Sequence, residues 1–190
     1  AYLENDLSFG AISPDYASGL AALLQGKVAL PDGVIALKGQ VTGPISWGLS
    51  VIDAQQQPII HDRVLGDAVS KHIGLKAAWQ EQQLRRHHPQ TIVFIDEPYL
   101  ASLGSACMRL SRDQVSSMLE EVLHAITGTK GIHCCGDTDW ALVLETSADI
   151  VSFDAYDYAP RLAEHGREVA AFLERGGILA WGIVPAGAAA

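Results

Sequence analysis

The feature that most constrains this chain is a regular alternation of short apolar runs with longer helical stretches. Most of the apolar runs are continuous and end in Gly, Pro or acidic residues, as strands do. Strands are expected over residues 34–41, 91–95, 131–135, 149–153 and 178–184, and helices over 62–87, 111–126, 139–146 and 160–175. Continuous apolar strands joined by helices are typical of a parallel sheet that is covered on both faces. The sequence therefore predicts an α/β fold.

Polar residues stand at the carboxyl end of four successive strands. Thr42 follows the first, Asp96 the second and Asp154 the fourth, while His133 and Cys135 lie at the end of the third. Functional sites of α/β proteins gather at these strand ends, and a barrel brings all of them around one mouth. This pattern favours a (β/α)8 barrel of the TIM type.

The chain is short for such a barrel, which takes about 250 residues. Its 190 residues form one domain by length, residues 1–190, without repeats or linkers. We expect an incomplete barrel, either a fragment or a shortened form. An open barrel exposes two sheet edges, so a homo-oligomer that covers them is a further expectation.

Charge, hydropathy and cysteine content indicate which partners, which compartment and which cysteine chemistry to expect. The 13 Lys and Arg stand against 22 Asp and Glu, a net charge of −9, which argues against nucleic acid and anionic lipid as partners. No apolar run is long enough to span a membrane, and the start does not resemble a signal peptide, so a cytoplasmic protein is expected. Three cysteines, two of them adjacent, fit chemistry or metal binding better than disulfides.

A histidine and a cysteine two residues apart suggest a metal site. Side chains alternate along a strand, so His133 and Cys135 face the same side. Imidazole and thiolate are zinc ligands, and Asp154 is the nearest carboxylate that could join them. The alternative is that His133 and Cys135 are ordinary core residues.

Three further segments could contact a small molecule. The Asp96-Glu97 pair could bind a substrate ammonium group or act as acid and base. The alternative for this pair is a helix cap or a surface turn. Thr42 could offer its hydroxyl to a ligand or merely form a turn. Trp140 could line a pocket, although packing after the N-cap Asp139 is the favoured interpretation.

Four segments taken in order resemble the catalytic barrel of cobalamin-independent methionine synthase. The chain is also similar to the related corrinoid-dependent methyltransferases and to uroporphyrinogen decarboxylase. The segments are KGQVTGP at 38–44, IDEP at 95–98, IHCCG at 132–136 and ADIVSFD at 148–154. Together they span most of the chain.

The resemblance implies a barrel with zinc held by His133 and Cys135. It also implies an acidic ligand at the position of Asp154, where the methionine synthases have Glu. Asp96 corresponds to the aspartate that contacts the amino group of homocysteine. The final cysteine ligand of that family is missing, because no cysteine follows Cys135.

By this resemblance the expected reaction moves a methyl group to a zinc-bound thiol such as homocysteine. The donor would be a methylated corrinoid or methyltetrahydrofolate. A corrinoid carried by a separate protein is favoured, because the extra N-terminal barrel of the folate enzymes is not present in this sequence. One alternative is a decarboxylase-like lyase that uses Asp96 or Glu97, for which Lys38 is the only well-placed basic residue. The other alternative is a degenerate barrel that acts as a binding subunit.

Overall fold

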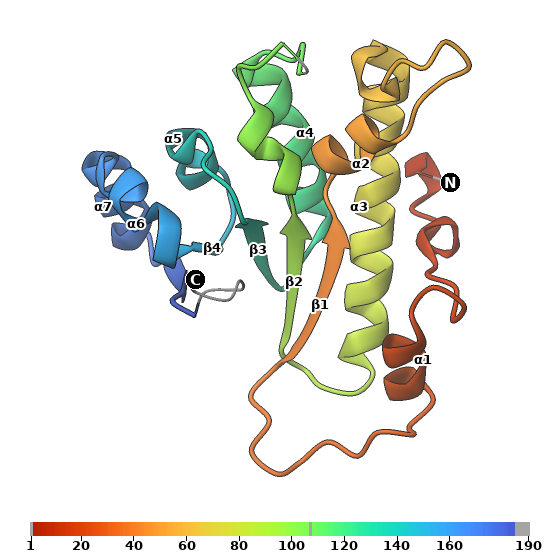
Figure 1. Ribbon diagram of the computed structural model, residues 1–190. Helices are drawn as coiled ribbons and strands as arrows, with labels where there is room; N and C mark the ends of the chain where they lie inside the picture. The colour runs from red at the N-terminus through yellow and green to blue at the C-terminus, as the bar shows by residue number, and fades with distance from the viewer. Residues whose placement is uncertain (1, 107, 185–190) are drawn as a thin grey trace, which may run out of the picture.

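The computed structural model describes residues 2–106 and 108–184, and its centre is one parallel sheet (Figure 1). The sheet has five strands in the order β1-β2-β3-β4-β5, so each strand pairs with the next one along the chain. The strands are β1 (Leu37–Thr42), β2 (Thr91–Asp96), β3 (Thr129–Cys134), β4 (Ile150–Asp154) and β5 (Ile178–Gly182). Sequential parallel order is the order of a (β/α) barrel, but this sheet is open, with β1 and β5 as its edges.

Helices connect the strands, and an additional helical segment precedes the first one. The α-helices are α1 (Ser18–Leu24), α2 (Pro44–Ser50), α3 (Arg63–Arg85), α4 (Arg112–Ala125), α5 (Trp140–Glu145), α6 (Ala155–Ala163) and α7 (Gly166–Glu174). Short 3-10 helices are η1 (Tyr2–Glu4), η2 (Leu7–Gly10), η3 (Ile59–His61) and η4 (Pro98–Ser102). Several begin at a side-chain cap, as α3 does at Asp62 and α4 at the capping box of Ser111 and Gln114.

The core lies between the sheet and its helices. Val41, Ile95, Ile132 and Phe153 point from four strands into this layer and are buried. Along β1 the burial alternates strictly, as expected for a strand with only one covered face. The other face, which we call the open face, carries Lys38, Gln40, Thr42, Asp96, His133 and Ser152. The first three of these are exposed and the others half-buried, so no described element fully covers this face.

The structure confirms the α/β class and corrects several details. The open face lacks a full cover in the described residues, whereas coverage of both faces was expected. The sheet does not close in the described residues, which agrees with the expected incomplete barrel without confirming a barrel. The helix expected over 160–175 is two helices, because the Asp154 side chain caps α6 directly and the chain turns between Ala163 and Gly166. The first strand begins at Leu37, since Ile35 is exposed in the preceding loop.

Candidate functional site

A row of polar side chains crosses the open face near the carboxyl ends of the strands. Thr42 pairs in register with Asp96, and Asp96 pairs with His133. His133 in turn pairs with Ser152. Residues in register on parallel strands point to the same face, so these four side chains form one line. The sequence predicted three of them, and only Ser152 was missed, although strand alternation places it on the same side as Asp154.

Hydrogen bonds orient Asp96 within this row. Lys38 Nζ donates to Gln40 Oε1 at 2.8 Å, and Gln40 Nε2 donates to Asp96 Oδ2 at 2.8 Å. Lys38 also lies 4.7 Å from the centre of the Phe94 ring, a cation–π contact that fixes its position. Oδ1 of Asp96 has no hydrogen-bond partner among residues 2–106 and 108–184. The carboxylate therefore offers one oxygen to a donor group outside the protein.

His133 is held in a similar way. Its Nδ1 lies 3.1 Å from the hydroxyl oxygen of Ser152 on the neighbouring strand. Nε2 makes no hydrogen bond within the described part of the chain. The ring is half-buried, so its second nitrogen can meet a ligand or a metal ion on the open face.

Glu97, proposed above as an acid or base, points the other way and is completely buried. Its carboxylate accepts hydrogen bonds from Ile45 N (2.9 Å), Ser46 N (2.8 Å) and Ser46 Oγ (2.6 Å) at the start of α2. Gly43 makes room for it, because a Cβ atom there would lie 2.1 Å from Glu97 Oε1. Burial raises the pKa of Glu97 to about 7 against the opposing effect of these hydrogen bonds. Glu97 therefore joins β2 to α2 and does not face a substrate on the open side.

Trp140 lies in the core. Its side chain is 1% exposed and meets Phe153 edge to face, with ring centres 5.5 Å apart. The indole nitrogen is buried without a hydrogen-bond partner in the described structure. This placement agrees with the packing alternative and not with a substrate contact.

The three residues expected as zinc ligands have different surroundings. Asp154 Oδ1 accepts hydrogen bonds from Tyr156 N and Asp157 N and so caps α6. Cys135 lies just beyond β3 and is exposed. No group of three or more His, Cys, Asp and Glu that could hold a metal ion occurs within residues 2–106 and 108–184.

Of the other two cysteines, Cys134 is a poor candidate for a metal ligand. Cys134 faces the core, and its burial raises the thiol pKa to about 11. Cys107 lies outside the described residues.

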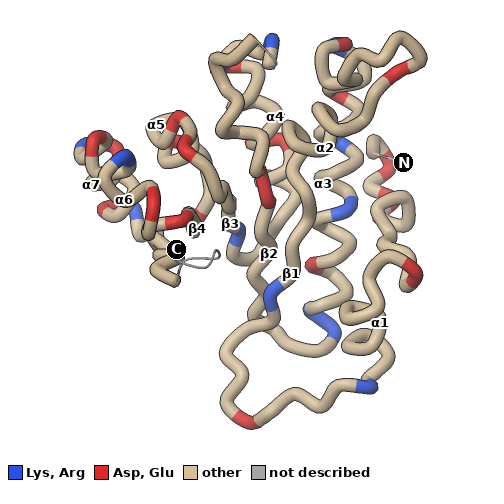
Figure 2. The backbone as a smooth tube through the Cα atoms, viewed as in Figure 1, with Lys and Arg blue, Asp and Glu red and all other residues tan. Residues whose placement is uncertain are grey.

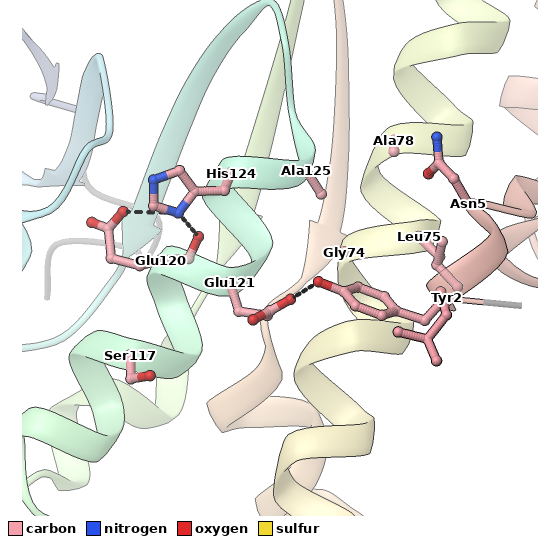
Figure 3. Close-up of a pocket in the computed structure, with 11 residues that line it drawn as sticks. Tyr2, Asn5, Gly74, Leu75, Ala78, Ser117, Glu120, Glu121, His124 and Ala125 are labelled. Carbon is pink, nitrogen blue, oxygen red and sulfur yellow. Dashed lines mark hydrogen bonds and ion pairs between the residues drawn. The ribbon is translucent and has the colours of Figure 1, made fainter.

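A separate cavity of about 680 Å³ lies in the helix layer, where η1 meets α3 and α4 (Figure 3). The Tyr2 hydroxyl donates a hydrogen bond to Glu121, and His124 Nδ1 contacts the carbonyl oxygen of Glu120 (Figure 3). None of the site residues predicted from the sequence lines this cavity. The open face is therefore the better candidate site.

Comparison with known proteins identifies no relative of this chain. No protein-family model, no curated protein and no solved structure matches this chain. None of the helices in the described residues is long and apolar enough to cross a membrane. Figure 2 shows basic and acidic residues scattered along the described backbone.

Proposed function

We propose that the open face is part of the catalytic face of a thiol methyltransferase. The observation that carries this proposal is the row of Asp96, His133 and Ser152, in which Asp96 and His133 each keep one polar atom free. In the proposed reaction a sulfur–carbon bond forms on the thiol while the bond from the methyl group to its donor breaks. The thiol proton passes to solvent. A methylated corrinoid presented by a separate protein is the favoured donor, with methyltetrahydrofolate as the second choice.

Asp96 is the residue that would hold the thiol substrate in place. Its free oxygen can accept a hydrogen bond from a substrate ammonium group, and a charge-assisted bond of this kind is among the strongest. Lys38 and Gln40 keep the carboxylate in one orientation. A small amino thiol such as homocysteine fits this recognition, because a short chain separates its ammonium group from its thiol.

Zinc fits this site only in part. His133 and Cys135 offer two ligands of the right chemistry, whereas a zinc site with an open position uses three protein ligands. We therefore assign no step of the reaction to a metal ion.

A binding experiment tests the role of Asp96. Titration calorimetry with homocysteine under reducing conditions should show saturable binding to the wild-type protein. Asp96→Asn should weaken it about 10-fold or more, since a hydrogen bond to a charged group contributes about 1.5–3 kcal/mol. Asp113→Asn, an exposed acid on α4, serves as the control and should bind like wild type. Equal binding by wild type and Asp96→Asn would contradict the assignment.

The second candidate is a barrel that works without metal, as a decarboxylase-like lyase or a binding subunit. The observation in its favour is that no three-ligand metal group forms in the described residues. Elemental analysis after reconstitution with zinc separates the candidates. About one zinc ion per chain supports the methyltransferase, for which His133 and Cys135 would supply two of the ligands, and no zinc supports the second candidate.

A further inference from the structure

An arginine and a histidine meet at the carboxyl end of the sheet, on loops that the proposed function does not use. His61 ends η3, in the connection that follows β1, and Arg109 lies between η4 and α4, in the connection that follows β2. Both connections leave the sheet at the end to which the strand arrows point (Figure 1). The pair therefore lies at the same end of the sheet as Asp96 and His133.

Arg109 places a hydrogen-bond donor against each of the two ring nitrogens of His61. Arg109 Nη2 lies 3.2 Å from His61 Nδ1, and the backbone N–H of Arg109 lies 3.4 Å from His61 Nε2. A neutral imidazole has only one acceptor nitrogen. Whichever tautomer is present, one of the two contacts brings two N–H donors together. An imidazolium ring would make both contacts donor to donor.

Arg109 is exposed, so its guanidinium is accessible to a ligand from solvent. Its guanidinium donates to the neutral Gln57 Oε1 at 3.2 Å, and it forms no ion pair with a carboxylate of the described residues. Arg112 is a useful contrast, because it contacts Asp139 at 3.0 Å and Glu145 at 2.8 Å. Burial, and then the charge of Arg109, lower the pKa of His61, which favours the neutral ring.

We propose that Arg109 and His61 form an oxyanion subsite that takes a carboxylate or phosphate group of a ligand. An oxygen atom beside Arg109 Nη2 and His61 Nδ1–H, which lie 3.2 Å apart, can accept a hydrogen bond from both and offset the repulsion between the two donors. Its negative charge also compensates the guanidinium, which a water molecule in the same place would not do. Arginine suits this task because its planar guanidinium matches the oxygens of these groups. The inference does not depend on methyl transfer at the open face.

Anion titration followed by NMR tests the subsite. Inorganic phosphate and acetate are added separately to the full chain at constant ionic strength, and the imidazole signals of His61 are followed. We expect a saturable shift with at least one of the two anions. Arg109→Gln should weaken that binding about 10-fold or more, since the lost contact is a hydrogen bond to a charged group.

Matched variants separate recognition from general effects of charge. Arg112→Gln removes an arginine that is already paired and should leave the His61 titration unchanged. Arg109→Lys keeps the charge without the guanidinium geometry and should bind more weakly than wild type but better than Arg109→Gln. Thermal unfolding checks that each variant is folded. A shift that never saturates, or one that Arg109→Gln retains in full, would overturn the proposal and leave the function proposed for the open face untouched.

Discussion

At the scale of single residues, Glu97 is under two opposing influences. Removal from water favours its neutral form, whereas the N–H groups of Ile45 and Ser46 and the Ser46 hydroxyl favour the carboxylate. The balance leaves a pKa of about 7. This carboxyl group holds the start of α2 against the end of β2, so its titration changes the stability of the protein.

The predicted consequence is a stability that falls as pH rises. The pKa of Glu97 is higher in the folded protein than in the unfolded chain. The contribution of this carboxyl group to the free energy of unfolding is therefore fully present below pH 4.5 and is lost as pH increases toward about 7. Chemical denaturation of wild type between pH 5 and 8 should show this loss relative to Glu97→Gln, which does not titrate. At pH 8 Glu97→Gln should still be less stable than wild type by about 1–3 kcal/mol. The amide N–H groups of the new side chain would face the backbone N–H donors of Ile45 and Ser46. Parallel pH profiles of the two proteins would refute the assignment.

Strand alternation explains which residues the sequence could place. Thr42, Asp96 and His133 were predicted to share one edge of the sheet, and they do, since parallel strands bring their ends together. The roles of Glu97 and Trp140 could not be predicted in the same way. Adjacent residues at a strand end point to opposite faces, and only the position of α2 decides which carboxylate of the Asp96-Glu97 pair is buried.

At the scale of elements, local side-chain caps decide where helices begin. The capping box of Ser111 and Gln114 was recognisable from the sequence, because it depends only on two side chains three positions apart. The boundary of α6 was not recognisable, because Asp154 could be read as a strand end, a metal ligand or a cap. The structure places its carboxylate on the N–H groups of Tyr156 and Asp157.

Asp154 therefore provides a test of this cap. Asp154→Ala should lower the free energy of unfolding by about 1 kcal/mol, within the usual range of 0.5–2 for loss of an N-cap. Asp154→Asn should stay close to wild type, because asparagine caps about as well as aspartate. Urea denaturation measures both values. An alanine variant as stable as wild type would show that the cap contributes nothing to α6.

At the scale of the whole molecule, the described sheet has two unpaired edges. The β5 edge is the more apolar, with Ile178 54% and Trp181 55% exposed. Trp181 contacts Phe153, with ring centres 5.2 Å apart, whereas Ile178 points to the open face. A parallel sheet with an apolar edge in water is a template for pairing with another strand. The sequence predicted these strands and an incomplete barrel with two exposed edges. It could not show whether the strands belong to a barrel, because closure depends on contacts between strands far apart in the chain.

Self-association through the β5 edge is the consequence we expect for this chain on its own. Sedimentation velocity over a range of concentrations should detect a reversible oligomer in the wild-type protein. Ile178→Lys places a charge on the exposed edge strand and should weaken association about 10-fold or more, as lysine does on natural edge strands. Ile35→Lys is the control, because Ile35 is 86% exposed but lies in a loop outside the sheet. If both variants associate as wild type does, or if wild type stays monomeric at every concentration, the β5 edge is not an interface between copies of the chain.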